Sequence, residues 1–350
     1  MAVPLKYTNM SKIRTVAILL ICILGLHVVL PISPAEAYAA LTAPSAILFE
    51  PNSEKIIFAR APHRKQAPAS TTKLVTALVV LDMLSLDDWV TVSSRVEHVE
   101  PSKLFLRGGD RLRVRDLLKA VLMNSANDAA SALAISVSGS ERAFADLMTR
   151  KARSLRARNT RFVNASGLPA RGQYSTAYDL ALIMREATKN DVIVSILKQK
   201  KAFIQTYTGK PFHLRSHNKM LWRHGRVIGK TGWTRGAKYC FVGSIQEGRP
   251  GTIVVVLGSR KLWIDLSTLV NQAVGVSRGS SGKNLSIYAK GEDVEELQLG
   301  LKRAGFFKGR ATGYFGKKTR KAVLRFQHSH GLSVDGIVGV QTRRALAPYL

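Results

Sequence analysis

The feature that most constrains the fold of this chain is an apolar run, 74–81, that follows directly on Ser70 and Lys73. A run of this length and regularity predicts a buried helix. Pro68 suits the first turn of such a helix, where a missing N–H costs nothing. Because Ser70 and Lys73 are three residues apart, their side chains share one face. The run therefore predicts a serine and a lysine held side by side at the start of a core helix.

This pair has two interpretations. A serine hydroxyl is a weak nucleophile until a base takes its proton, and a lysine amine can do so when burial or a neighbouring cation lowers its pKa. The simpler interpretation is an N-cap serine followed by a solvated lysine, because so short a pattern is common by chance. The rest of the chain has to decide between a nucleophile with its base and an ordinary helix start.

The N-terminus indicates export. Three basic residues, Lys6, Lys12 and Arg14, precede an apolar stretch over 16–26, and small residues follow. This is the pattern of a signal peptide, and we expect residues 1–37 to be removed. An uncleaved anchor is the alternative, but the apolar span is short for a bilayer. We therefore expect a protein of the periplasm or of the cell wall, with no stable membrane anchor after cleavage.

The charge of the chain limits its partners. Its net charge is +30, spread along nearly the whole length, and its apolar content of 46% is typical of a globular protein with a core. Such a positive field favours polyanions, which include nucleic acid, anionic lipid and acidic cell-wall polymers. For an exported protein we expect a wall polymer and no nucleic acid.

We expect no metal and no cofactor. His328 and His330 lie close together in the sequence, but no third ligand follows at a recognisable spacing. No glycine-rich phosphate loop is present. Of the two cysteines, Cys22 lies in the predicted signal peptide and Cys240 has no partner. Packing, and not a disulfide, must therefore stabilise the fold.

The order of elements predicts an α+β domain over residues 38–275. Strands are expected near its start, helical patterns fill its middle, and strongly apolar strands are expected over 240–245 and 252–257. This order fits an antiparallel sheet with a helical cluster. A Gly/Ser-rich linker, 276–284, then leads to a second unit over 285–350. That unit contains a near-repeat of a glycine turn that leads into a helix, and it predicts a small three-helix core.

Two further polar clusters stand at the ends of predicted buried elements. Ser125 and Asn127 lie on the tight connection between two helices, where an N-cap for the second helix is the simpler interpretation. Lys230 and Thr231 lie near the end of a strand. Gly232 follows them and removes a side chain where another backbone must come close.

Chemistry assigns each cluster a role in acyl transfer. Ser70 attacks a carbonyl and Lys73 accepts its proton. Ser125 relays that proton to the leaving amine, and Asn127 holds the substrate amide. A second lysine nearby would also lower the pKa of Lys73.

The remaining residues suit the charged parts of a substrate. Lys230 and Thr231 offer a cation and a hydroxyl to a carboxylate. The backbone N–H groups of Ser70 and Trp233 are candidates for an oxyanion hole, with Gly232 beside them. The predicted substrate-binding set is therefore Asn127, Lys230, Thr231, Gly232 and Trp233.

The three clusters together resemble the serine penicillin-recognising enzymes. Within these, the chain over about 40–275 resembles the low-molecular-mass D-alanyl-D-alanine carboxypeptidases. The motifs that carry the resemblance, in chain order, are Pro68–Leu74, Ser125–Ala130, Asn164–Pro169, Ser175–Leu180 and Lys230–Thr234. The resemblance implies removal of the terminal D-alanine from the peptidoglycan stem pentapeptide through an acyl-enzyme on Ser70. It also implies that Lys230 grips the terminal carboxylate and that β-lactams acylate Ser70.

The tail resembles the small peptidoglycan-binding domains that accompany wall hydrolases. Its motifs are 322–327 and 335–339. A helical dimerisation unit is the alternative, because resemblance in fold does not determine function. Better-known relatives end in an amphipathic helix that lies on the membrane, whereas here the enzymatic domain leads into the wall-binding unit. We therefore expect retention on peptidoglycan and not on lipid.

Three other functions compete with the carboxypeptidase. A class A β-lactamase needs a carboxylate to activate the deacylating water, and the loop over 164–174 contains no acid. A D,D-endopeptidase or a transpeptidase uses the same acyl-enzyme with a different leaving amine or acceptor, and the sequence does not separate these cleanly. A non-catalytic wall-binding protein is the third, against which the intact clusters argue.

Overall fold

The computed structural model describes residues 41–225, 227–246, 251–273, 284–346 and 349–350. The predicted signal peptide, 1–37, lies outside the described residues. So does the predicted linker, 276–284, except for its last residue. Both remain predictions.

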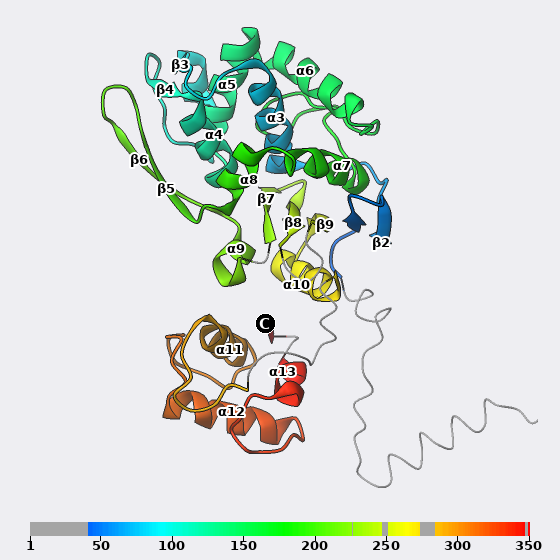
Figure 1. Ribbon diagram of the computed structural model, residues 1–350, viewed down its shortest axis with the longest axis vertical. Helices are drawn as coiled ribbons and strands as arrows, with labels where there is room; N and C mark the ends of the chain where they lie inside the picture. The colour runs from blue at the N-terminus through cyan, green and yellow to red at the C-terminus, as the bar shows by residue number, and fades with distance from the viewer. Residues whose placement is uncertain (1–40, 226, 247–250, 274–283, 347–348) are drawn as a thin grey trace, which may run out of the picture.

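The centre of the first domain is a five-stranded antiparallel sheet in the order β2-β1-β9-β8-β7. The first hairpin of the domain therefore lies against its last strands (Figure 1). The strand β7 forms one edge of the sheet, so one of its sides is open to other elements. The strands are β1 Ser45–Glu50, β2 Lys55–Arg60, β7 Val227–Thr234, β8 Lys238–Ile245 and β9 Ile253–Ser259.

Helices cover both faces of this sheet. On one face α7 packs against β9 and β1, and the remaining helices of the cluster lie above it (Figure 1). On the other face α10 packs against β9 and β8. Because both faces are covered, β1 and β9 are buried along almost their whole length, which explains their continuous apolar sequences. The helices are α3 Lys73–Met83, α4 Val114–Met123, α5 Asn127–Ser138, α6 Glu141–Ser154, α7 Ala177–Ala187, α8 Asp191–Lys198, α9 Lys219–His224 and α10 Leu262–Ala273.

The predicted core helix is confirmed as α3. Its residues 73–80 are all buried, and it packs against α4, α5, α6 and α7. The helix differs from the prediction at its start, because a short 3-10 turn, η1 Ala69–Thr72, precedes it and carries Ser70. Lys73 is fully buried. The interpretation of Lys73 as a solvated lysine is therefore wrong.

The short helices α8 and α9 escaped the sequence analysis. The helix α8 begins after Asn190, whose side chain accepts hydrogen bonds from Val192 N and Ile193 N. Asn218 caps α9 in the same way. Two small ribbons complete the domain, together with a second 3-10 turn. They are β3 Trp89–Thr91 with β4 Arg111–Arg113, β5 Lys201–Gln205 with β6 Pro211–Arg215, and η2 Ser94–His98.

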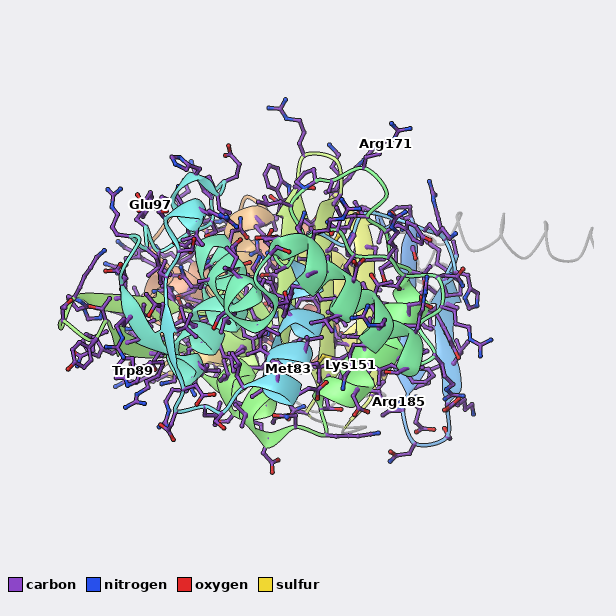
Figure 2. All side chains as sticks on the ribbon, turned by 90° about the horizontal axis from the view of Figure 1, so that it is seen from above. Met83, Trp89, Glu97, Lys151, Arg171 and Arg185 are labelled. Atoms are coloured by element: carbon purple, nitrogen blue, oxygen red, sulfur yellow. The ribbon has the colours of Figure 1, made fainter. Side chains whose placement is uncertain are left out.

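The strand β7 runs further than predicted, so Lys230 and Thr231 lie within it and not near its end. The charged side chains are spread over the molecule, as the sequence indicated. Arg171 and Arg185 lie on opposite edges of the view in Figure 2.

The C-terminal unit has a core of its own. It consists of α11 Glu292–Arg303, α12 Lys317–Ser329 and α13 Val340–Leu346, and its buried residues include Leu297, Phe315 and Phe326. The predicted glycine turn is present, because Gly316 is the N-cap of α12. Across the described ranges of both units, no helix combines the length and the hydropathy that a membrane span requires.

Candidate active site

Ser70 lies on η1, directly before α3, and its hydroxyl faces the amine of Lys73. The Lys73 Nζ atom is 3.0 Å from Ser70 Oγ. Pro68 stands at the N-cap of η1, so the chain enters the turn with a fixed φ. The short spacing and the buried helix thus place the two side chains together as the sequence predicts.

The other partners of Lys73 determine what its amine can do. Nζ also lies 2.6 Å from Asn127 Oδ1 and 2.6 Å from the carbonyl oxygen of Ser166. Both of these oxygens can only accept hydrogen bonds. A neutral Lys73 amine therefore donates its two hydrogens to them and turns its lone pair to the Ser70 hydroxyl, which is the geometry of a general base.

The environment favours this neutral form. Burial lowers the pKa of Lys73 well below its usual value, and the positive charge of Lys230 acts in the same direction. The carboxylates of Glu141 and Asp128 oppose the shift. Burial is the largest cause, so the core position of α3 favours the neutral amine that a general base requires.

A second lysine lies across the site. Lys230 Nζ donates to Ser125 Oγ at 2.9 Å and to the carbonyl oxygen of Thr231 at 2.8 Å. Burial lowers the pKa of Lys230 to about 7. Ser125 lies on the connection between α4 and α5 with a φ of 60°, a left-handed conformation that side chains other than glycine seldom adopt. The tight connection turns its hydroxyl toward β7.

Gly232 allows β7 to pass close to η1. A Cβ atom at this position would lie 2.8 Å from Ser70 N and 3.0 Å from the Cβ atom of Ala69. The predicted close approach of two backbones at Gly232 is therefore confirmed. It places the amide of Ser70 beside the segment that carries Trp233, where the oxyanion hole is predicted.

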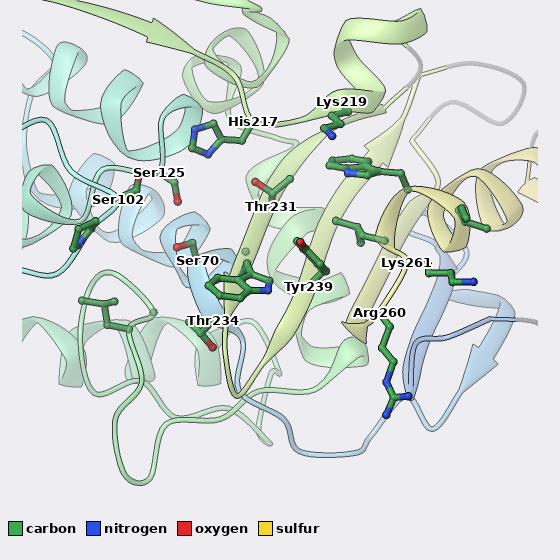
Figure 3. Close-up of a pocket in the computed structure, with 18 of the residues that line it drawn as sticks. Ser70, Ser102, Ser125, His217, Lys219, Thr231, Thr234, Tyr239, Arg260 and Lys261 are labelled. Atoms are coloured by element: carbon green, nitrogen blue, oxygen red, sulfur yellow. The ribbon is translucent and has the colours of Figure 1, made fainter. Parts of the chain in front are cut away.

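These residues line one cleft with a volume of about 820 Å³, shown in Figure 3. The volume is within the range of sites that hold small molecules and short peptides. The predicted residues at its surface are Ser70, Ser125, Asn127, Thr231, Gly232 and Trp233.

Lys73 and Lys230 do not line this cleft. Both are buried beneath its surface, with 0% and 1% of their area exposed. The amine of Lys230 is already bonded to Ser125 Oγ and to a backbone carbonyl oxygen. A direct grip of Lys230 on a substrate carboxylate therefore remains a prediction, and in the structure the residue at the surface is Thr231.

Sequence reasoning missed His217, which lines the cleft beside Ser125 (Figure 3). Partial burial of the ring lowers the pKa of His217 to about 4, and the charges of Lys230 and Lys73 act in the same direction. The residue stands alone between β6 and the cap of α9, so no motif marks it.

Asp128 was also missed as a supporting residue. Its carboxylate accepts hydrogen bonds from Leu104 N and Leu106 N. Asn127 N donates to the carbonyl oxygen of Ser102, at 2.7 Å. The start of α5 thereby holds the loop that forms the wall of the cleft at Ser102. A sequence signal existed in Asp128 itself, an acid within the first turn of an otherwise buried helix.

The loop over 164–168 supplies the backbone oxygen that contacts Lys73. Asn164 Oδ1 accepts from Gly167 N at 2.7 Å, and this fold directs the Ser166 carbonyl oxygen to Lys73. Glu141 supports the same loop, because its carboxylate accepts from Ala165 N and from the Ser131 hydroxyl. Glu141 is not among the residues that line the cleft.

Within the described residues, no group of three or more His, Cys, Asp and Glu side chains is arranged to hold a metal ion. The polar groups near Ser70 in the cleft are hydroxyls, the Asn127 amide and the His217 imidazole, with two lysine amines beneath the surface.

Comparison with known families agrees with this geometry. Residues 32–261 match the family model of the D-alanyl-D-alanine carboxypeptidases of peptidase family S11, and residues 290–346 match a peptidoglycan-binding domain. The predicted α+β fold with an antiparallel sheet, a helical cluster and a small C-terminal helical unit is thereby confirmed.

Two relatives of this chain are named for different activities, one as a carboxypeptidase and one as an endopeptidase. The chain is 34% identical over 223 residues to the D-alanyl-D-alanine carboxypeptidase DacF of Bacillus subtilis, which covers 62% of this chain and 57% of DacF. It is 32% identical over 250 residues to the D-alanyl-D-alanine endopeptidase of Escherichia coli, covering 67% and 80%. The chain thus spans little more than half the length of DacF.

Solved structures share the fold. A D-alanyl-D-alanine carboxypeptidase from Mycobacterium tuberculosis superposes with a TM-score of 0.63 at 29% identity, covering 67% of this chain and 91% of that one. Penicillin-binding protein D2 of Listeria monocytogenes, in its ampicillin-bound form, superposes with a TM-score of 0.58 at 28% identity, covering 67% and 98%.

Proposed function

Because the chain belongs to the D-alanyl-D-alanine carboxypeptidase family of serine peptidases, we propose that it removes the terminal D-alanine from peptidoglycan stem pentapeptides. The observation that carries the proposal is the set of contacts that joins three distant segments. Lys73 faces Ser70 at 3.0 Å, and Lys230 faces Ser125 at 2.9 Å from the other side of the same cleft.

Acylation begins at Ser70. Its Oγ attacks the carbonyl carbon of the penultimate D-alanine while neutral Lys73 accepts the hydroxyl proton. The backbone N–H groups of Ser70 and Trp233 stabilise the charge that develops on the carbonyl oxygen. Asn127 holds the substrate amide through its side-chain amide group.

The leaving group departs toward β7. The C–N bond of the terminal residue breaks, and Ser125 relays the proton from Lys73 to the D-alanine amine. The carboxylate of that residue lies at the Thr231 hydroxyl, with the charge of Lys230 beneath it. Water then attacks the ester carbonyl while Lys73 takes its proton, the bond between the acyl carbon and Ser70 Oγ breaks, and Lys73 returns the proton to Oγ.

The same arrangement supports capture of β-lactams, whose strained amide acylates Ser70. The ampicillin-bound relative is consistent with this. The carboxypeptidase activity is favoured over the endopeptidase alternative by the family model and by DacF, although one relative carries the endopeptidase name.

The test uses the full chain and a fluorescent penicillin. We expect the wild type to be labelled on Ser70 and to release D-alanine from a pentapeptide muropeptide, and Ser70→Ala to lose both. Ser195→Ala, a change at an exposed serine on α8, is the matched control and should keep both. Labelling of Ser70→Ala, or a wild type that releases no D-alanine, would contradict the proposal.

We further propose that the mature protein acts outside the cytoplasm and that the unit over 285–350 retains it on peptidoglycan. The match to a peptidoglycan-binding domain and the separate core of this unit support the proposal. A chain that ends at residue 275 should still react with penicillin but should no longer sediment with purified peptidoglycan. Equal sedimentation of the two forms would argue for a different role, such as dimerisation.

A further inference from the structure

One stretch of the sequence has a charge pattern that the proposed reaction does not explain. Residues 192–246 contain no Asp or Glu, whereas Lys or Arg occupies eleven positions. The proposed reaction uses one of these cations, Lys230. A run of like charges is ordinarily a solvated face, but a rigid cluster of one sign also attracts ligands of the other. The arrangement of these cations in the fold therefore decides between the two.

The centre of this stretch is the ribbon of β5 and β6, which has one packed face and one bare face. Ile204 and Leu214 are buried on the packed face, which lies against α4. The ribbon extends from α9 along the helical cluster toward β4 (Figure 1). At its tip, Tyr207 N donates to the carbonyl oxygen of Arg111 on β4 at 2.8 Å. Packing along one face and this contact at the tip hold the ribbon in place.

The bare face carries two pairs of residues that lie directly opposite each other on the two strands. Lys201 lies opposite Arg215, and Phe203 lies opposite His213. All four side chains are exposed, and we term them the ribbon face. They share one side of the ribbon because side chains alternate along a strand. None of them lines the cleft that contains Ser70, so the ribbon face is a separate surface.

The pair of cations is unfavourable in the protein alone. Like charges directly opposite each other on neighbouring strands destabilise a sheet. Among the described residues, no acid forms an ion pair with Lys201 or Arg215. Arg215 is nevertheless held in position, because its Cζ atom lies 4.3 Å from the centre of the Trp222 ring. A bound anion would relieve the repulsion between the two cations.

An aromatic surface lies next to this pair of cations. Phe203 is 53% exposed, and the centre of its ring lies 5.4 Å from that of His213 in a tilted arrangement. An exposed aromatic ring offers a flat apolar surface on which the C–H groups of a sugar ring can pack. The row of cations and rings thus matches a ligand that alternates anionic groups with sugar rings.

A membrane surface matches the ribbon face less well. Binding at a lipid interface depends on a broad apolar face that enters the headgroup region. Both strands of the ribbon are described in full, and Phe203 is the one large apolar side chain that they present on this face. Its neighbours along β5 are Lys201 and Gln205, which are polar. The face therefore lacks the apolar area that insertion into lipid requires.

We propose that the ribbon face binds a linear acidic glycopolymer of the cell envelope. Its anionic groups, phosphate or carboxylate, lie between Lys201 and Arg215, and one of its sugar rings packs on Phe203. The choice of an envelope polymer rests on the proposed location outside the cytoplasm. The site itself requires neither acyl transfer at Ser70 nor the unit over 285–350.

The test measures binding of the full chain to three soluble polymers by calorimetry. A glycosylated poly(glycerol phosphate) supplies phosphate, polygalacturonate supplies carboxylate, and dextran is neutral. The variant Lys201→Gln/Arg215→Gln removes the pair of cations. The control Arg142→Gln/Arg153→Gln removes the same net charge from exposed positions on α6, elsewhere in the helical cluster (Figure 1). Protein that has first reacted with penicillin shows whether the cleft contributes.

We expect the wild type to bind at least one of the two acidic polymers, before and after reaction with penicillin, and not to bind dextran. The ribbon variant should bind that polymer about three- to thirtyfold more weakly, the range for two exposed ion pairs, and the control should stay within about twofold of the wild type. The slope of log affinity against log salt should fall by about one to two in the ribbon variant, because two contacts no longer release counterions. Phe203→Ala should weaken binding but leave this slope unchanged.

Loss of binding in the ribbon variant should not come from unfolding, because the change removes a repulsion. Thermal unfolding checks that the variant is at least as stable as the wild type. All variants should also keep the labelling of Ser70 by fluorescent penicillin. A chain that binds the polymer but is not labelled would contradict the proposed function and leave the ribbon face intact.

Three results would overturn the proposal for the ribbon face. The first is a wild type that binds neither acidic polymer. The second is an equal loss in the ribbon variant and the control, which would mean that the net charge of the whole chain attracts the polymer. The third is tighter binding to vesicles that contain phosphatidylglycerol, lost in the same ribbon variant, which would assign the face to lipid. None of these results bears on acylation of Ser70.

Discussion

Lys230 Nζ donates a hydrogen bond to Ser125 Oγ at 2.9 Å, although 105 residues separate them in the chain. This contact joins the edge strand β7 to the connection between α4 and α5. It also brings a second cation to the site where Lys73 must be neutral, and the charge of Lys230 lowers the pKa of Lys73. The proposed nucleophile, base and proton relay are therefore linked by one pair of buried lysines.

Removing the relay hydroxyl should slow acylation. We expect Ser125→Ala to reduce the acylation rate by about 10²–10⁴-fold, the usual range for a lost general acid–base group. Because Lys230 acts through the same hydroxyl, Ser125→Ala/Lys230→Met should cost less than the product of the two single changes. The measurement is single-turnover acylation by a chromogenic penicillin. Independent, multiplicative effects would show that the contact has no catalytic role.

The close approach at Gly232 can be tested by adding one methyl group. Gly232→Ala would place a Cβ atom 2.8 Å from Ser70 N and force β7 away from η1. We expect acylation to fall by about 10²–10³-fold, as for the loss of an oxyanion-hole donor. Gly236→Ala is the control, since no atom lies within 4 Å of its added Cβ. Equal acylation rates for the two variants would show that acylation does not depend on the close approach at Gly232.

The two lysines predict a bell-shaped pH profile of kcat/KM. Activity should rise with pH as Lys73 loses its proton, because only the neutral amine is a base. It should fall as pH passes about 7, where the Lys230 amine of the free enzyme loses its charge. In Lys230→Arg the guanidinium stays charged, so the alkaline limb of the profile should move to higher pH. If the alkaline limb does not move, the group that titrates there is not Lys230.

Above pH 7 the titration of Lys230 should raise the stability of the protein with pH, although the same titration should lower its activity. Its pKa is about 7 in the folded protein and the ordinary 10.5 in the unfolded chain, so the unfolded chain binds more protons between these values and stability rises with pH there. Below pH 7 the cost of the buried charge is fully present. At pH 6 we expect Lys230→Met to raise the free energy of unfolding by about 1–4 kcal/mol.

This gain should shrink as pH rises toward 10. Urea denaturation at pH 6 and pH 10 measures it, with the exposed Lys198→Met on α8 as the control. A Lys230→Met variant less stable than the wild type at pH 6 would mean that the hydrogen bond to Ser125 outweighs the cost of burial.

The acyl-enzyme formed with penicillin should persist. The loop over 164–174 has no acid, and the carboxylate of Glu141 is held by Ala165 N and the Ser131 hydroxyl behind that loop. Among the described residues, no Asp or Glu side chain therefore lines the cleft to activate water. Intact-mass measurement after mixing should show one equivalent of adduct that decays slowly. Rapid multiple turnover would revive the β-lactamase alternative.

Local patterns identified most of the elements that carry the site. The apolar run over 74–81 predicts α3, and the continuous apolar segments predict β8 and β9, because long buried elements leave a strong periodic or continuous signal. The short helices α8 and α9 were missed, since their signal is mainly one capping asparagine each. Lys73 and Lys230 are selected by residue type and motif, and their roles in the reaction remain predictions.

What the sequence by itself determined was the set of candidate reactive groups, because hydroxyl, amine and amide side chains at set spacings already limit the chemistry. Only the tertiary structure decided how they act. Burial of Lys73 and Lys230 sets their pKa values, and that burial comes from packing between segments far apart in the chain. The same packing placed His217 in the cleft, although no local pattern marks it.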